Sequence, residues 1–352
     1  MASIAPNPDD NNACWVCLNG AGDKRSPLLR DCACHGSSGF AHLKCLTRSA
    51  INHTESFLHS KNEKPSGGSN RHSSVGSHFG PRGCNPWSEC PLCKYPYEGE
   101  TLQALACAIQ QRYGKDLRII SDISDNKSQS LSKERGEKSP FPIYFQKSSL
   151  STIANAKAKG SKRTCKEEAI RLYQLLLEIE RSEQESFAGR RCTALEKRIV
   201  SEELVAMCCM GEIYADLGQC QNALAILEGA LALTERRDCR DEEASDGRAR
   251  ALRIMSEVML SNGNLDGAER CIREAKDIWD SRSKQGTQHH GLEHFKYLWQ
   301  SGVVLVEVGN RDKNCLAALT RTLVKAEREL GSDYSLVRTW KQAIEKYRQS
   351  CP

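Results

Sequence analysis

Apolar residues recur at helical spacing over the second half of the chain, from about residue 163 to residue 350. Residues three, four or seven positions apart share one face of a helix, so this periodicity predicts helices rather than strands. One pattern of small and bulky residues occurs twice at the same offsets, first at Gly211, Tyr214, Gly218, Ala223, Leu227 and Ala230, and again at Ser256, Met259, Gly263, Ala268, Ile272 and Ala275. A weaker copy aligns Gly302, Leu305 and Gly309. We expect pairs of helices that cross closely at their small residues.

This pattern resembles the tetratricopeptide repeat, in which helical hairpins stack into a solenoid. The copies are spaced 45 and 46 residues apart rather than about 34, so the resemblance is to the longer, kinesin-light-chain style of repeat. The segment CKEEAIRLYQLLLEIERSE is expected to be the second helix of a degenerate first unit. The segment DYSLVRTWKQAIEKYRQS is expected to be a capping helix.

The resemblance implies a concave face that binds a peptide or a helix of a partner protein. By the repeat register, Arg250, Arg253, Lys296 and Trp299 fall near that face. The three basic residues either meet an acidic segment of a partner or are ordinary exposed charges.

The first half of the chain lacks this periodicity except in one short stretch. Residues 100–112, ETLQALACAIQQR, place Leu102, Leu105, Ala106 and Ile109 on one helical face, which we expect to pack on the preceding residues. The predicted organisation is a disordered lead (1–13), a cysteine-rich module (14–97) with a flexible polar insert (59–83), a helix (98–113), a polar linker (114–162) and the helical repeats (163–350).

Composition narrows the function. The net charge of +5 over 352 residues is too small to argue for nucleic-acid binding. No apolar run approaches the roughly 20 residues of a membrane helix, and no signal peptide is evident. We therefore expect a cytoplasmic or nuclear protein. In such a reducing compartment, clustered members of the 18 cysteines are metal ligands rather than disulfides.

Eight residues between positions 14 and 93 have the spacing of metal ligands. In chain order they are Cys14, Cys17, Cys32, Cys34, His42, Cys45, Cys90 and Cys93. A Cys-x2-Cys turn directs two sulfurs at one centre, and four ligands make one tetrahedral site, so we predict two Zn2+ ions. We interpret His35 as a surface residue. Cys84 is a weaker candidate than Cys90, because only Cys90 has a cysteine partner three residues away.

The order and spacing of these ligands resemble the RING-CH (RING-variant) family of ubiquitin ligases, and so do CWVC, SPLLRDCACHGSSGFAHLKCL and CPLCKY. PHD fingers share the ligand order, but they usually place a tryptophan two residues before the seventh ligand, whereas Trp87 is three before Cys90. The resemblance covers about residues 14–97 and implies a small α+β cross-brace module followed by an all-α solenoid of helical hairpins. It assigns Cys14, Cys17, His42 and Cys45 to one zinc, and Cys32, Cys34, Cys90 and Cys93 to the other.

The resemblance also implies a docking surface for a ubiquitin-conjugating enzyme that carries ubiquitin. Its residues in this chain are Val16, Leu46, Pro91, Leu92 and the cation Lys94. Family members often have a tryptophan where this chain has Ser49. Trp87 either takes that role or packs in a core.

We therefore predict a RING-type ubiquitin ligase that acts by positioning, with no catalytic side chain or covalent intermediate of its own. The helical repeats would recruit a protein substrate or adaptor. The alternative is a non-catalytic scaffold for protein–protein interaction, in which zinc only stabilises a docking module; a PHD-like chromatin-reading role ranks below both.

Overall fold

A computed structural model provides the structure of the chain. It describes residues 13–20, 28–29, 32, 34, 40–62, 85–114, 143–187, 193–235, 242–284, 292–308, 313–332 and 334–350. The chain divides into two compact units: residues 1–153 with 329–335, here called the zinc-module unit, and residues 154–328 with 336–352, here called the helical unit. None of the helices in these described ranges has the length and apolar character needed to cross a membrane.

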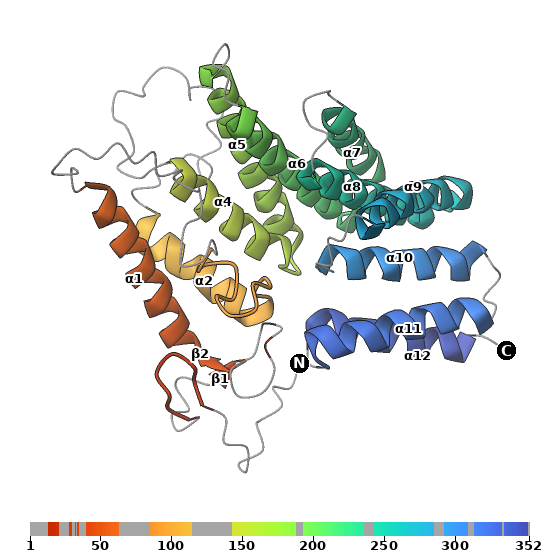
Figure 1. The fold of residues 1–352 in the computed structure, drawn as a ribbon, viewed down its shortest axis with the longest axis horizontal. Coiled ribbons are helices and arrows are strands. Elements are labelled where there is room, and N and C mark those ends of the chain that lie inside the picture. The colour runs from red at the N-terminus through yellow and green to blue at the C-terminus, as the bar shows by residue number, and fades with distance from the viewer. Residues whose placement is uncertain are drawn as a thin grey trace. The chain divides into compact units, whose positions relative to one another are not determined.

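The zinc-module unit is built on a short β hairpin and a long helix. Strands β1 (Leu28–Leu29) and β2 (Ala41–His42) pair antiparallel, with Leu28 opposite His42. Helix α1 (Leu43–Asn62) begins directly after β2, as Figure 1 shows at the base of this helix. The first residues of the predicted insert, 59–62, therefore belong to α1, and residues 63–83 of the insert lie outside the described residues.

Helix α2 (Gly99–Tyr113) packs beside α1 and buries the face predicted from sequence. Leu105 and Ile109 are fully buried, and Trp87 is 1% exposed. The ring of Tyr113 joins this core, because it contacts Trp87 and Phe145 edge to face at centroid distances of 6.1 and 5.2 Å. Trp87, helix α2 and Phe145, which are far apart in the sequence, thus share one small apolar core.

The structure differs from the expected polar linker at residues 143–158, which form helix α4 (Ile143–Ala158). Phe145, Leu150 and Ile153 of this helix are fully buried. These apolar residues are separated by serine, threonine and lysine and form no regular stripe, so local periodicity did not reveal the helix. Its burial depends on tertiary partners that the sequence pattern does not contain.

The helical unit consists of successive helices. They are α5 (Arg163–Phe187), α6 (Thr193–Asp216), α7 (Cys220–Glu235), α8 (Glu242–Ser261), α9 (Leu265–Lys284), α10 (Leu292–Val308), α11 (Lys313–Leu330) and α12 (Ser335–Ser350). Among the described connections, short turns join α6 to α7 and α8 to α9. From α5 to α10 each helix contacts the next, and α8 also contacts α6 and α10. Helices α6, α8 and α10 therefore form one layer of a stacked-hairpin array.

The repeated small residues lie where helices approach most closely. A Cβ atom on Gly211 would lie 2.8 Å from Leu227, and one on Gly302 would lie 2.5 Å from Leu319. Gly218 and Gly263 have φ angles of 70° and 73°, as expected for residues that end one helix before the next begins. The prediction of a zinc-binding module followed by an all-helical region is confirmed; the tetratricopeptide assignment stays a prediction.

Candidate metal centre and docking groove

The two Cys-x2-Cys turns have the same backbone structure. The N–H of Cys14 donates to the carbonyl of Asn19, and the N–H of Cys90 donates to the carbonyl of Tyr95, each at 2.9 Å. These bonds close the chain into a loop that directs both cysteines of each turn to one side. Segments about 75 residues apart thus repeat one structural device for holding a metal.

Each turn also contains a residue with a left-handed backbone immediately after its second cysteine. Leu18 and Lys94 have φ angles of 62° and 64°, and their N–H groups donate to the carbonyls of Cys14 and Cys90. A side chain at positive φ costs roughly 1–2 kcal/mol. Both turns carry this cost, so the geometry must be stabilised by something beyond local backbone preference.

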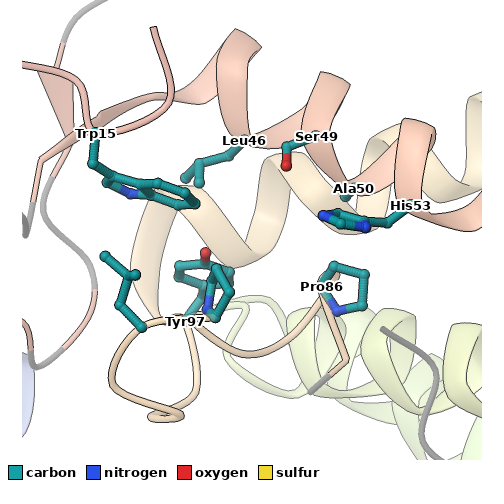
Figure 2. Close-up of a pocket in the computed structure, with 9 residues that line it drawn as sticks. Trp15, Leu46, Ser49, Ala50, His53, Pro86 and Tyr97 are labelled. Atoms are coloured by element: carbon teal, nitrogen blue, oxygen red, sulfur yellow. The ribbon is translucent and has the colours of Figure 1, made fainter. Parts of the chain in front are cut away.

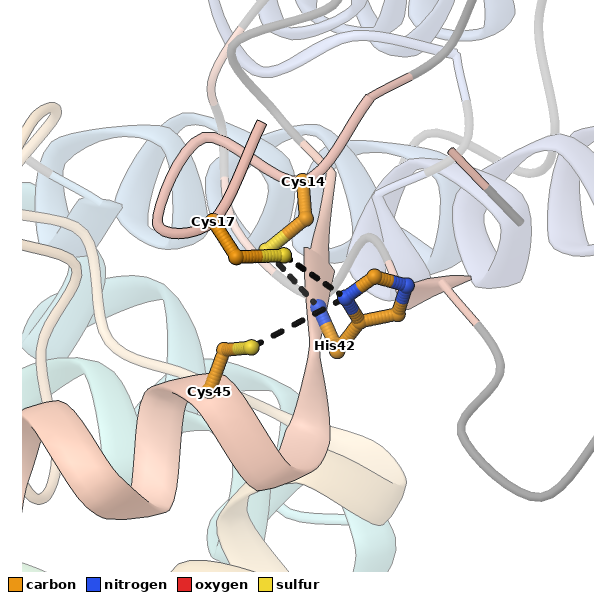
Figure 3. Close-up of side chains that lie close together, drawn as sticks. All are labelled: Cys14, Cys17, His42 and Cys45. Carbon is orange, nitrogen blue, oxygen red and sulfur yellow. Dashed lines mark hydrogen bonds between the residues drawn. The ribbon is translucent and has the colours of Figure 1, made fainter. Parts of the chain in front are cut away.

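The first cluster joins Cys14, Cys17, His42 and Cys45 (Figure 3). The Nδ1 atom of His42 lies 3.4 Å from the Cys17 sulfur and 3.8 Å from the Cys45 sulfur. The other ring nitrogen, Nε2, lies 3.3 Å from the carbonyl of Gly20, which can accept its proton. Such a bond orients a ligating imidazole and leaves Nδ1 unprotonated toward the sulfurs.

The second cluster joins Cys32, Cys34, Cys90 and Cys93, and the sulfurs of Cys34 and Cys90 are 3.6 Å apart. Cys90 is fully buried and Cys32 is 7% exposed. The structure thus groups the eight residues in the two sets that the cross-brace resemblance implies. His35 and Cys84 lie outside the described residues.

The donor atoms of both clusters fit zinc. In each, the four donor atoms lie within 4.8 Å of one another. A tetrahedral Zn2+ with Zn–S bonds of about 2.3 Å holds its sulfurs about 3.8 Å apart, close to the distances observed. Three sulfurs with one imidazole nitrogen, and four sulfurs, are both donor sets of structural zinc sites.

Acidity within the clusters points the same way. Burial opposes ionisation of Cys14, but hydrogen bonds from backbone N–H groups, including that of His42, outweigh burial and lower the pKa of Cys14 to about 7. In the second cluster, hydrogen bonding with Cys34 raises the pKa of Cys32. Hydrogen bonding with Cys32 has the opposite effect on the other two cysteines: it lowers the pKa of Cys90, and it lowers the pKa of Cys93 to about 7. A divalent cation binds such thiolates and replaces the protons that neighbouring thiols would otherwise share.

A groove of about 200 Å³ lies beside the clusters, between α1 and the segment that carries Cys90 (Figure 2). Its lining residues are Trp15, Leu46, Ser49, Ala50, His53, Pro86, Pro91, Leu92 and Tyr97. It therefore brings together three of the predicted docking residues, Leu46, Pro91 and Leu92. The other two, Val16 and Lys94, are exposed but do not line the groove.

Two tryptophans have roles that the sequence left open or missed. Trp87 is a core residue whose Nε1–H donates to the Thr54 hydroxyl at 2.9 Å, so it does not take the place of the tryptophan expected at Ser49. Trp15 lines the groove and was not among the predicted docking residues. Its position inside CWVC, next to Val16, was the available signal.

In the helical unit, charged side chains meet across three helices. The Arg253 guanidinium of α8 lies 2.6 Å from Glu212 of α6 and 3.4 Å from Glu293 of α10. Arg250 lies 3.2 Å from Glu212, and Lys296 lies 2.9 Å from Glu293. Arg253 is only 5% exposed, so its interpretation as an ordinary exposed charge is wrong. We call these five residues the ionic layer.

The ionic layer perturbs its own carboxyl groups. Burial alone would raise the pKa of Glu293, but Lys296, Arg250 and Arg253 outweigh it and lower that pKa to about 2. The pKa of Glu212 is lowered in the same way, chiefly by Arg250 against its burial. Trp299, also predicted near the concave face, stacks on Trp340 of α12 with ring centroids 4.6 Å apart.

Comparison with family models matches residues 14–56 to the RING-variant domain. A comparison with curated proteins found no match. The matched range contains six of the eight clustered residues and ends before Cys90 and Cys93. The structure supplies the remaining pair by folding the chain back onto Cys32 and Cys34.

Proposed function

Because this chain carries a RING-variant domain, a zinc module of the RING ubiquitin-ligase type, we propose that it is a ubiquitin ligase that positions a ubiquitin-conjugating enzyme. The observation that carries the proposal is the groove between α1 and the segment of Cys90. Leu92, which lines the groove, is 51% exposed, and Val16, which follows the lining residue Trp15, is 36% exposed. Exposed apolar side chains that converge on a preformed groove are typical of a protein-docking site.

The proposal includes two zinc ions per chain. Cys14, Cys17, His42 and Cys45 would hold one, and the four cysteines of the second cluster the other. Bound zinc supplies folding free energy to so small a module and takes no part in transfer. The chain's own residues hold Lys94 at a fixed position relative to the groove.

Transfer then proceeds by positioning. An apolar loop of the conjugating enzyme docks against Leu46, Pro91 and Leu92, and the exposed ammonium of Lys94, directly after the last ligand, contacts the enzyme and its ubiquitin. Held in one arrangement, the thioester is attacked by a lysine of the substrate at a higher rate. The chain itself forms no covalent bond with ubiquitin.

We propose that the helical unit recruits the substrate or an adaptor. Stacked helical hairpins offer an extended face to a partner peptide or helix. The layer of α6, α8 and α10 is the face we assign to this role.

The decisive experiment is an autoubiquitination assay of the full chain with a panel of conjugating enzymes. We expect transfer with at least one enzyme, and loss of it in Val16→Arg or Leu92→Arg with zinc content unchanged, because each places a charge in an apolar contact. The scaffold alternative, favoured by Ser49 in place of a tryptophan, predicts no transfer and no bound conjugating enzyme. Zinc-loaded protein that is silent with every enzyme would refute the ligase.

A further inference from the structure

The two Cys-x2-Cys turns share one backbone structure but differ in what covers them. In the first turn, Leu18 and Asn19 are both exposed. In the second turn, Tyr95 takes the place of Asn19, and its side chain is half-buried. The ring of Tyr95 packs edge to face on the ring of Tyr334, with centroids 6.4 Å apart. The turn that carries Lys94 is therefore covered by a residue that is distant in sequence.

Tyr334 lies in the short connection between two helices. Helix α11 ends at Leu330, and α12 begins at Ser335. Gly331 follows α11 with a φ angle of 89°, and its carbonyl accepts the N–H of Tyr334 at 3.3 Å. Residues 329–335 belong to the zinc-module unit, although the remainder of both helices belongs to the helical unit. We call residues 329–335 the bracing segment.

A second contact joins the bracing segment to the residues after the turn. The hydroxyl of Ser335 donates a hydrogen bond to the carboxylate of Glu98. Glu98 stands at the N-cap position of α2 but makes no side-chain capping bond to that helix. Tyr334, the residue before Ser335, is only 5% exposed. Two adjacent residues of the bracing segment thus hold Tyr95 and Glu98, which are three positions apart.

These contacts add to the restraints on the backbone of Lys94. On one side of Lys94, Cys93 belongs to the second cluster. On the other side, the carbonyl of Tyr95 accepts the N–H of Cys90 at 2.9 Å. Rotation of the backbone at Tyr95 would have to move a ring that is packed on Tyr334. The contact between the two rings therefore limits the directions in which the Lys94 side chain can leave the turn.

We propose that Tyr334 is a positioning residue for ubiquitin transfer. By packing on Tyr95 it restrains the turn, so that the ammonium of Lys94 keeps one place relative to the groove. Displacement of a positioned group by about 1 Å can cost much of a rate enhancement, so a looser turn slows transfer without weakening docking. This inference rests on the proposed function and assigns a role in it to a residue outside the matched range 14–56.

The first measurement is hydrogen exchange of the zinc-loaded full chain. In Tyr334→Leu, we expect the backbone N–H groups of Cys90 and Lys94 to exchange about 3- to 10-fold faster, the range for loss of one aromatic pair. The N–H groups of Cys14 and Leu18 in the first turn are the internal reference and should not change. Tyr334→Phe keeps the ring and should exchange like wild type.

The second measurement separates docking from transfer, with a conjugating enzyme that the chain activates. Tyr334→Leu should slow ubiquitin discharge about 3- to 10-fold at saturating enzyme and leave the affinity for the enzyme unchanged. In a Lys94→Ala background it should have no further effect, because it acts through Lys94. The matched control is Tyr347→Leu, at a half-buried tyrosine of α12 in the helical unit, which should discharge at the wild-type rate.

Different results overturn different claims. If Tyr334→Leu leaves exchange in the Lys94 turn unchanged, the positioning role is refuted, whether or not the chain is a ligase. If it slows discharge equally in the Lys94→Ala background, or weakens docking in parallel, Tyr334 is only structural and the ligase proposal stands. If wild-type protein activates no conjugating enzyme, the proposed function itself fails. Zinc content should equal that of wild type in every variant, which separates motion of the turn from loss of metal.

Discussion

The zinc-module unit and the helical unit solve the problem of stability in different ways. The only sheet among the described residues of the first has strands of two residues each, and beside its small apolar core around Trp87 two Cys/His clusters gather polar donor atoms. The helical unit instead has a continuous apolar core, in which Leu252, Ile272 and Tyr297 of α8, α9 and α10 pack together. A small module of this kind needs a bound ion, whereas stacked helices need only one another.

The same contrast applies to charge. In the zinc module, a bound metal cation would balance the negative charge of the thiolates. In the ionic layer, Glu212 and Glu293 are matched by arginines and a lysine of the chain itself. The first unit should therefore respond to metal and the second to pH and to loss of a charge partner. The following experiments test that division, from the largest expected effect to the smallest.

Metal chelation should distinguish the two units most clearly, because it should unfold only the zinc module. Structural zinc contributes roughly 10–16 kcal/mol of apparent binding free energy at pH 7, more than a small module has in reserve. We expect a strong chelator to remove two zinc ions per chain and to abolish hydrogen-exchange protection around the clusters, while helices α6 to α10 keep theirs. Equal loss of protection in both units would contradict separate stabilisation.

Removing one ligand should have a smaller effect. In Cys90→Ser, we expect one zinc per chain, because the second cluster loses its fully buried ligand while the first is untouched. Cys107→Ser is the matched control, since Cys107 is exposed on α2 and belongs to neither cluster. Metal analysis by mass spectrometry under native conditions distinguishes them; two zinc ions in Cys90→Ser would refute the second site.

In the helical unit, Arg253→Met should destabilise by about 1.5–3 kcal/mol, because Glu212 and Glu293 lose one cationic partner but keep Arg250 and Lys296. Zinc content should not change. The control is Arg273→Met, whose ion pair with Glu269 is solvent-exposed and should contribute less than about 1 kcal/mol. Denaturant unfolding followed by helical circular dichroism measures both. Equal effects would show that the ionic layer contributes no more than a surface pair.

The pH dependence of the helical unit follows from the same residues. The pKa of Glu293 is about 2 in the folded chain and about 4.3 when unfolded, so its contribution is complete above the unfolded value. As pH falls from about 4.5 to 2, the unfolded state takes up the proton first and stability declines. Thermal unfolding of Glu293→Gln should show a shallower decline over this range than wild type.

The smallest effects are expected at Leu18 and Lys94, the two residues whose backbone has a left-handed conformation. Glycine at Leu18 or at Lys94 removes the cost of a side chain at positive φ, and we expect each variant to be more stable by at most about 1 kcal/mol. Zinc retention during a chelator titration measures this. The activity should differ: Lys94→Gly should slow ubiquitin transfer, and Leu18→Gly should not. Equal activity in both would remove Lys94 from the mechanism.

Much of this protein is determined by local sequence alone. The two Cys-x2-Cys turns and the pair at His42 and Cys45 identify metal ligands by their spacing, because a tight turn needs only adjacent residues. The repeated small residues predict helical hairpins for a similar reason, since Gly211 and Leu227 belong to helices joined by a short turn. The interactions in both cases are between residues close in the chain.

Only the tertiary structure decided the rest. It placed Trp87 in a core rather than on the docking surface, and it buried α4 where polar sequence had suggested a linker. It also gathered the ionic layer from three helices and packed Tyr95 on Tyr334. These arrangements depend on contacts between segments far apart in the chain, which no local periodicity or spacing encodes, because burial and charge pairing are set by the partner that each segment meets after folding.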